Sequence, residues 1–193
     1  MKRPIHPFAA RLLMAIASLV GLFASAYLFY TYISGIPIAC GSGSGCEIVR
    51  LSKWAWTFGI PRPLLGLAFY VGLFGLLVAR VATDWQKRWL YRLTMLAAVV
   101  GFIESAFLFL IQWLDIRAFC IWCLISALSA TVIAMAAWFD RAEDPRHVSA
   151  ERELKAYFIT LLIFVPIAFA TFAYLIQPKT VNVQEVLQQS SAK

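Results

Sequence analysis

Residues 119–139 read FCIWCLISALSATVIAMAAWF, a C-x-x-C pair of thiols followed by an apolar run without a charged side chain. A helix of about 20 apolar residues crosses the hydrocarbon core of a bilayer. The run therefore predicts a transmembrane helix with two thiols near its N-terminal end. A spacing of three places the sulfur atoms of Cys120 and Cys123 on nearly one helical face, with Cys123 about one turn deeper.

Four further segments are comparably apolar, and they cover 8–33, 63–81, 91–113 and 156–176. Charged residues cluster between them, and 62% of the chain is hydrophobic, far above the share in a water-soluble domain. A chain of 193 residues with five such segments has little length left for a soluble domain. We therefore expect one all-α integral membrane domain over 1–193.

The first apolar segment also fits a cleaved signal peptide. Lys2 and Arg3 precede it, and the tripeptide 24–26 (Ala-Ser-Ala) resembles a signal-peptidase site. The apolar run continues past this site to Ile33, which is longer than a usual signal core. This length favours a retained helix.

Basic side chains are distributed unequally between the two sides of the predicted helices. Eleven of the 17 Lys and Arg residues lie on the side of the N-terminus, and the other six lie on the side of the cysteines. Cytoplasmic loops carry the excess of Lys and Arg, so we expect a cytoplasmic N-terminus and both cysteine pairs on the other side. That compartment supports disulfides, whereas the cytosol does not. The net charge of +7 accordingly indicates membrane orientation and gives no reason to expect a nucleic-acid partner.

The first pair of thiols, Cys40 and Cys46, is separated by Gly-Ser-Gly-Ser-Gly. Glycine and serine make flexible connectors, which suit a mobile carrier better than a rigid structural disulfide. The following residues, 47–54, are amphipathic but too short to span a bilayer, so we expect an interfacial half-helix anchored by Trp54 and Trp56. Cys46 would lie at the N-terminal end of this half-helix, where the helix dipole favours the thiolate.

Two further side chains are candidates for contact with a ligand. Glu104 lies near the middle of the third predicted helix, where a carboxylate is costly and needs a partner or a function. It either delivers protons to a ligand or pairs with a polar neighbour such as Ser105 or Gln112, and the usual behaviour of such groups favours the pairing. Phe58, near the cysteine loop, is a candidate cover for a ring-shaped ligand.

A series of motifs follows a fixed order along the chain. It consists of C-x5-CEIV-x-x-S at 40–52, FGIP at 58–61, Gly66, and C-x-x-C at 120–123. Each motif alone is weak, but their order and spacing over about residues 8–139 resemble the vitamin K epoxide reductase family, in particular its bacterial members. The resemblance implies a four-helix catalytic core around a quinone site.

Outside this core we expect three segments. Residues 140–155 would form a cytoplasmic link in which a helix starts near Ser149 and Glu151, 156–176 a fifth transmembrane helix packed outside the core, and 177–193 a short non-cytoplasmic tail. Many bacterial relatives carry a fused thioredoxin-like domain after the fifth helix, but this tail holds no cysteine. The redox partner is therefore expected to be a separate protein.

The family couples thiol oxidation to the reduction of a quinone, here ubiquinone or menaquinone. Its bacterial members reoxidise a thioredoxin-like or DsbA-like protein that introduces disulfides into secreted proteins. The resemblance implies that Cys40 exchanges with this partner and that Cys46 attacks Cys120, although the roles of Cys40 and Cys46 are interchangeable at this point. It also implies that Cys123 faces the quinone, in a bacterial inner membrane with the cysteines on the periplasmic side. Ser52 resembles a family serine that hydrogen-bonds the quinone or orients a thiol.

Position 127 favours a quinone over vitamin K epoxide, because animal members of the family resemble one another in a tyrosine there and this chain has Ala127. An unrelated bacterial disulfide oxidase on a four-helix bundle has its C-x-x-C in the first loop, whereas here C-x-x-C comes last.

Two other classes of protein stay open. One is a structural zinc site of four cysteines, for which the Gly/Ser spacer is awkward, and the other is a non-enzymatic scaffold with two inert disulfides.

Overall fold

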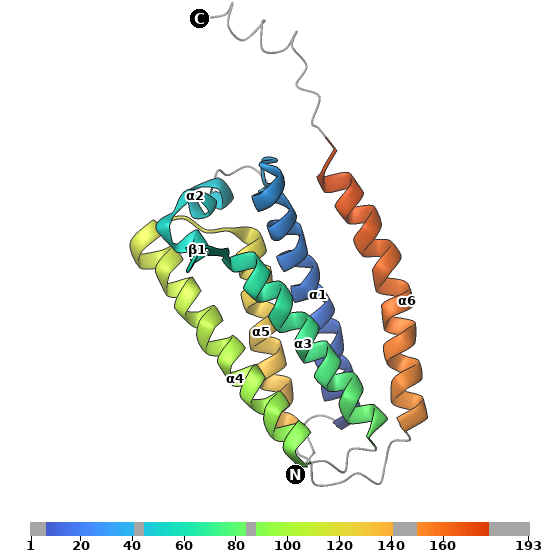
Figure 1. The fold of residues 1–193 in the computed structure, drawn as a ribbon. Helices are drawn as coiled ribbons and strands as arrows, with labels where there is room; N and C mark the ends of the chain where they lie inside the picture. The colour runs from blue at the N-terminus through green and yellow to red at the C-terminus, as the bar shows by residue number, and fades with distance from the viewer. Residues whose placement is uncertain (1–6, 41–44, 84–87, 141–149, 178–193) are drawn as a thin grey trace, which may run out of the picture.

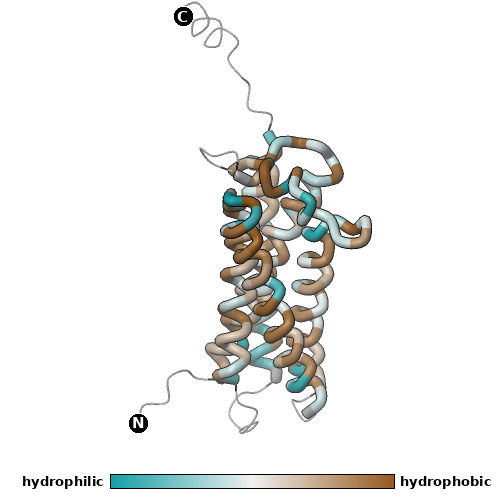
Figure 2. Tube along the Cα trace, turned by 90° about the vertical axis from the view of Figure 1, so that its left-hand side faces the viewer, coloured by the Kyte–Doolittle hydropathy of each residue, from teal (hydrophilic) through white to brown (hydrophobic). Residues whose placement is uncertain are grey.

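Five long helices run through the computed structural model, which describes residues 7–40, 45–83, 88–140 and 150–177. They are α1 (Pro7–Ser34), α3 (Arg62–Ala82), α4 (Arg88–Ile111), α5 (Ile121–Phe139) and α6 (Ala150–Leu175) (Figure 1). All five are long and apolar enough to cross a membrane, and hydrophobic residues dominate their length (Figure 2). The chain is thus an all-α multi-pass membrane protein, as the sequence predicts.

Four of these helices form a ring of contacts. α1 packs on α3 and α5, and α4 packs on the same two helices from the other side. α6 lies outside the ring against α1 and α3 (Figure 1). α1 is the most buried of the five helices and α6 the most exposed, which agrees with an apolar surface all around α1. The ring therefore positions the site, and α6 covers one of its outer faces.

Tyr70 on α3 connects three helices of the ring. Its aromatic ring lies so close to Gly21 on α1 that a β-carbon there would overlap it, and small residues permit such close approach between membrane helices. Its hydroxyl donates to the carbonyl of Ser126 on α5 at 2.6 Å. Because Tyr70 is only 2% exposed, these contacts fix the spacing of α1, α3 and α5.

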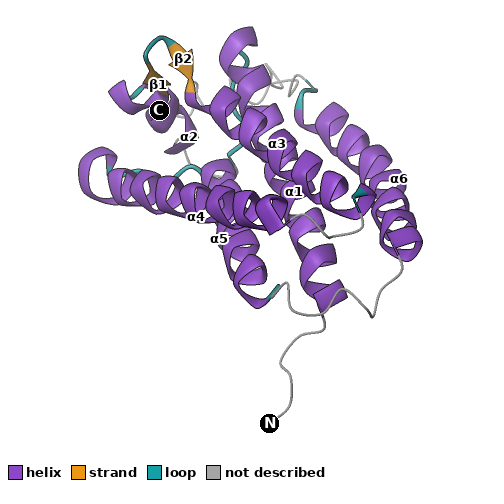
Figure 3. Cartoon of the chain, turned by 60° about the horizontal axis from the view of Figure 1, so that its bottom comes forward, coloured by secondary structure: helices purple, strands orange, loops and turns teal. Residues whose placement is uncertain are grey.

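A short segment between α1 and α3 caps one end of the ring (Figure 3). This cap consists of α2 (Gly45–Leu51), the 3₁₀ turn η1 (Lys53–Ala55) and an antiparallel hairpin of β1 (Trp56–Thr57) and β2 (Ile60–Pro61). The predicted half-helix 47–54 is therefore divided, because its α-helical part ends at Leu51. Ser52 takes an extended conformation, and its hydroxyl donates to the carbonyl of Val49 at 2.8 Å, which ends the helix.

The connection between α4 and α5 contains a π-helical turn, η2 (Gln112–Ile116). Such turns are rare and frequently occur at functional sites. Arg117 then adopts a left-handed conformation with φ 52°, and Cys120 adopts an extended one with φ −97° and ψ 116°. As a result α5 begins at Ile121 and not at residue 119 as predicted. Cys120 is the N-cap of α5, and Cys123 lies in its first turn.

α6 begins at Ala150, close to the helix start predicted near Ser149 and Glu151 and earlier than the predicted membrane segment at 156–176. The predicted link at 140–155 is therefore helical over its last residues. Other parts of the predicted loops lie outside the described residues, namely 41–44 of the Gly/Ser spacer, 141–149 of the link and 178–193 of the tail.

The end of the ring opposite the cap holds buried ion pairs. Arg11 on α1 contacts Asp140 at 3.0 Å and Glu153 on α6 at 2.7 Å. Arg80 on α3 contacts the same Asp140 at 2.7 Å. All four side chains are at most 7% exposed. Arg11 and Arg80 count toward the predicted cytoplasmic charge, and the structure shows that they also join the ends of four helices, since buried charges are tolerated where they are paired.

Candidate redox site

The four cysteines gather beneath the cap, at the end of the ring away from the buried ion pairs. Cys40 and Cys46 form a disulfide, and Cys120 and Cys123 are free thiols. Cys46 and Cys120 are each 1% exposed. They belong to one buried cluster, and the other two cysteines pack against it. The structure thus brings the two predicted pairs together, with the loop pair oxidised and the C-x-x-C pair reduced.

Gly45 brings the two pairs into contact. This residue directly precedes Cys46, and Phe119 directly precedes Cys120. A β-carbon on Gly45 would overlap the carbonyl oxygen of Phe119, so the two backbones touch one residue before the two cysteines. An exchange between Cys46 and Cys120 needs such proximity, because the thiolate of one cysteine must reach the sulfur of the other.

Cys120 accepts hydrogen bonds at the start of α5. The backbone N–H of Cys123 donates to its sulfur at 3.4 Å. The Cys123 thiol, and the N–H groups of Cys123 and Trp122, together lower the pKa of Cys120 from its ordinary value, although burial acts in the opposite direction. Cys120 therefore forms a thiolate more readily than an ordinary cysteine, which suits a sulfur that attacks or leaves in a thiol–disulfide exchange.

Gln112, the first residue of the π-helical turn, supports the same cysteine. Its side-chain oxygen accepts the backbone N–H of Cys120 at 2.9 Å, and the residue is 4% exposed. The sequence suggests Gln112 only as a partner of Glu104. A polar side chain within a predicted membrane helix, eight residues before C-x-x-C, is the signal that identifies it.

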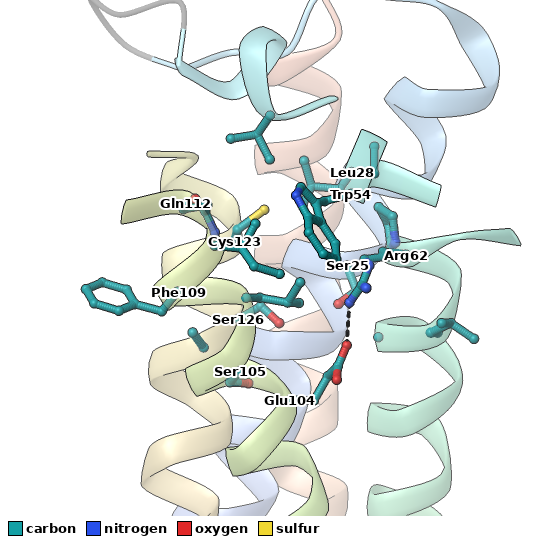
Figure 4. A pocket seen from close by; sticks show the side chains of 18 of the residues that line it. Ser25, Leu28, Trp54, Arg62, Glu104, Ser105, Phe109, Gln112, Cys123 and Ser126 are labelled. Carbon is teal, nitrogen blue, oxygen red and sulfur yellow. Dashed lines mark hydrogen bonds and ion pairs between the residues drawn. The ribbon is translucent and has the colours of Figure 1, made fainter. Parts of the chain in front are cut away.

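A cavity of about 480 Å³ lies among the ring helices under the cap (Figure 4). Cys123 lines it, together with Ser52 of the cap and Glu104 on α4. Much of the wall is apolar and includes Trp54 and Phe109. This size, and an apolar wall with a few polar groups, are typical of sites for small organic ligands. Three predicted site residues therefore share one cavity.

Glu104 has a different partner from those that the sequence suggests. Its carboxylate accepts a hydrogen bond from Nη1 of Arg62, the first residue of α3, at 2.5 Å (Figure 4). Arg62 thus takes the place of the predicted partners, Ser105 and Gln112. It also lines the cavity, and its Nε is buried without a hydrogen-bond partner among the described residues. Sequence reasoning missed Arg62 because 42 residues separate it from Glu104.

Phe58 does not line the cavity. It lies at the turn between β1 and β2 with a positive φ of 51°, and its side chain is fully exposed. The aromatic side chain that lines the cavity from the cap is Trp54, whose Nε1 donates to the carboxylate of Asp115. Trp54, predicted as an interfacial anchor, therefore takes the position that the sequence assigns to Phe58.

The segment leading to Cys40 is held by α2. Glu47 accepts the backbone N–H of Ile38 at 2.7 Å. Arg50 pairs with Glu47 at 2.8 Å and donates to two backbone carbonyls at the end of α1 and just beyond it. The helix that carries Cys46 therefore also orders the chain before its disulfide partner.

A known protein family matches the part of the chain that forms this site. The profile described as the vitamin K epoxide reductase family matches residues 12–138. The match covers more than half of the chain, and it includes all four cysteines and every residue that lines the cavity. The chain therefore belongs to the vitamin K epoxide reductase family, whose membership implies a membrane thiol–disulfide oxidoreductase.

Proposed function

We propose that this protein takes two electrons from a separate thioredoxin-like (DsbA-like) protein and passes them to a membrane quinone, ubiquinone or menaquinone. The observation that carries the proposal is the free thiol of Cys123 in the wall of an apolar cavity, beside the oxidised Cys40–Cys46 pair. A quinone headgroup is an apolar ring with polar oxygens, and the cavity offers apolar walls with a few polar side chains. Reoxidation of the partner supports disulfide formation in secreted proteins.

The redox state in the structure corresponds to one point of this cycle. The partner's dithiol first reduces the Cys40–Cys46 disulfide and becomes a disulfide itself. The Cys46 thiolate then attacks Cys120 of a Cys120–Cys123 disulfide and releases the Cys123 thiolate. Cys40 next attacks Cys46 and releases Cys120. This restores the loop disulfide and leaves the C-x-x-C pair reduced, as in the structure.

The C-x-x-C pair then returns to its disulfide form. Two electrons from Cys120 and Cys123, with two protons, pass to the quinone and convert it into a hydroquinone. The two thiols together lose two electrons and two protons to the quinone as the Cys120–Cys123 bond forms, and the lowered pKa of Cys120 favours the thiolate form of this cysteine. All atoms and electrons are then accounted for, and the protein is ready for another pair of electrons.

We assign two polar side chains of the cavity to the quinone. The hydroxyl proton of Ser52 is engaged with Val49, so the Ser52 oxygen is suited to accept a hydrogen bond from the hydroquinone. The buried Nε of Arg62 is suited to donate to a quinone oxygen. Glu104 is paired with Arg62, which supports a structural role for this carboxylate over proton delivery.

The alternatives are less well supported. A disulfide between Cys40 and Cys46 has no thiolate to offer a zinc ion. A scaffold with two inert disulfides gives no reason for a lowered pKa at Cys120 or for a cavity at Cys123. Ala127 also lines this cavity, and its small side chain leaves room for a quinone ring.

We further propose a location and an orientation. The protein would lie in a bacterial inner membrane, with its N-terminus cytoplasmic and its cysteines periplasmic. The chain would act as one domain, 1–193, with its catalytic core at 8–139. The distribution of basic residues supports this orientation. The cysteines and the buried ion pairs lie at opposite ends of the ring, so the orientation places the cysteines in the oxidising compartment.

The test is an assay of quinone reduction driven by a reduced thioredoxin-like protein. The wild type should reduce the quinone, and Cys123→Ala should not. Leu128→Ala is the matched control, because Leu128 lies on the same helix and is 65% exposed; it should retain wild-type turnover. Full activity in Cys123→Ala would contradict the proposed electron path.

A further inference from the structure

Both main-chain polar groups of Ala39, the residue directly before Cys40, are held by aromatic side chains. The Ala39 N–H donates to the hydroxyl oxygen of Tyr27 at 2.8 Å. The indole Nε1 of Trp122 donates to the Ala39 carbonyl at 2.8 Å. Trp122 lies between the two cysteines of C-x-x-C, so the second contact joins the redox helix directly to the loop disulfide.

The two aromatic side chains form one unit within the bundle. The ring centroids of Tyr27 and Trp122 lie 4.5 Å apart. Tyr27 has no exposed surface and also meets Phe172 of α6 edge-on, while Phe23 of α1 packs edge-on against Trp122. Both hydrogen-bonding groups are therefore held at fixed positions by α1, α5 and α6.

The contacts from α2 act differently on the same segment. Glu47 holds Ile38, but Glu47 belongs to the helix that carries Cys46. A movement of the cap could therefore shift both cysteines of the loop together. The contact between Trp122 and Ala39 instead fixes residue 39 relative to the helix that carries Cys123.

We propose that Tyr27 and Trp122 are positioning residues for the exchange between the two dithiols. This inference rests on the proposed function, because it assigns a device to the internal step of that cycle. In this step the Cys46 thiolate attacks Cys120, a Cys46–Cys120 bond replaces the Cys120–Cys123 bond, and Cys123 leaves as a thiolate. Cys40 then displaces Cys120 from Cys46. The aromatic pair keeps Cys40 within reach for this second attack by holding Ala39.

The experiment measures the internal step without a quinone. Protein with both disulfides formed is mixed with one equivalent of a reduced thioredoxin-like protein, and the reaction is stopped with acid and a thiol-alkylating reagent at successive times. Mass spectrometry then gives the fraction of electrons that has reached Cys120 and Cys123. A second measurement follows the oxidation of a chemically reduced C-x-x-C pair by a quinone.

Trp122→Phe and Tyr27→Phe each remove a hydrogen-bonding group and keep an aromatic ring. We expect each to slow the internal step by about fivefold to tenfold, the effect of one lost buried hydrogen bond. The rate of the quinone step should change by less than about twofold. The Tyr27 hydroxyl and the Trp122 indole N–H both bond to Ala39 and not to Cys123. Trp138→Phe, on α5 with an exposed side chain, should leave both rates unchanged.

Two outcomes would overturn the inference. One is an unchanged rate of the internal step in the double variant that carries both Trp122→Phe and Tyr27→Phe. The other is an equal loss of rate in the internal step and in the quinone step, which would indicate general damage to the bundle. Failure of the proposed function gives a different result. In that case the wild type moves electrons between the two dithiols but does not reduce a quinone. The effect of the two variants on the internal step can still be measured. A wild type without internal transfer would overturn both.

Discussion

The two ends of the helix ring bury polar groups in opposite ways. At one end, the carboxylates of Asp140 and Glu153 face arginine side chains, and the charges compensate one another. At the other end, Cys120 and Cys123 keep free thiols, and Cys123 borders a cavity. Buried charges are tolerated when paired, whereas reactive groups within a membrane usually serve a function. Burial of polar groups therefore does not mark the site; a reactive group beside a cavity does.

Loss of a cysteine should give the largest effect at the redox end. Cys120→Ser should reduce steady-state turnover to background, because the Cys46 thiolate then has no disulfide to attack. Thermal unfolding should stay close to that of the wild type, since a serine of similar size replaces a free thiol. Turnover well above background would show that electrons bypass Cys120.

Loss of a carboxylate at the ion-pair end should lower stability and leave turnover unchanged. Asp140→Ala leaves the buried Arg11 and Arg80 without this shared partner, and we expect the free energy of unfolding to fall by about 3–5 kcal/mol. Turnover per folded molecule should not change. Denaturant unfolding in detergent, together with the quinone assay, measures both quantities.

A matched control for this prediction lies on α6. Glu151 and Lys155 form an exposed pair at 2.6 Å, and Glu151→Gln should not measurably change stability, because exposed ion pairs contribute little. A similar loss of stability in Asp140→Ala and Glu151→Gln would remove the distinction between buried and exposed pairs. A loss of turnover in folded Asp140→Ala would show that the two ends are coupled.

A smaller effect is expected where the cap touches the redox helix. In Gly45→Ala the new methyl group overlaps the Phe119 carbonyl, so α2 must move away from Cys120. We expect the exchange between the dithiols to slow by about tenfold, because misplaced reacting atoms lose rate steeply. Oxidation of the C-x-x-C pair by a quinone should be unaffected. Gly75→Ala is the control, since a β-carbon there meets no atom.

Local signals in the sequence predict where the long helices lie and which cysteines form the two pairs. Apolar length predicts all five spans, and the structure has five helices long and apolar enough to cross a membrane. The family resemblance implies that Cys123 and Ser52 contact a quinone, and both residues line the same cavity. The short amphipathic segment after Cys46 predicts a helix with this cysteine near its N-terminus, and α2 begins one residue earlier, at Gly45. These features depend on residues close together in the chain, where periodicity and motif spacing carry the information.

Long-range partners could not be predicted in the same way. Arg62 pairs with Glu104, and Trp122 reaches Ala39, across separations of 42 and 83 residues. Trp54 lines the cavity and Phe58 does not, because the hairpin of the cap places Phe58 at its turn. Such contacts follow from the packing of helices and loops, and a single sequence gives the residue types without their relative positions.

The smallest predicted effect concerns the titration of Cys120. Its pKa is lowered chiefly by the hydrogen bond from the Cys123 thiol, and a thiolate forms as the pH rises through the pKa. Cys123→Ala removes this donor, so the thiolate of Cys120 should form at a higher pH than in Cys123→Ser, whose hydroxyl can still donate. Only one thiol titrates in either variant while the loop disulfide is intact, so thiolate absorbance assigns the change directly. An equal or lower titration midpoint in Cys123→Ala would show that the backbone N–H groups at the start of α5 are sufficient to lower this pKa, and that the redox end needs no thiol pair to prepare Cys120.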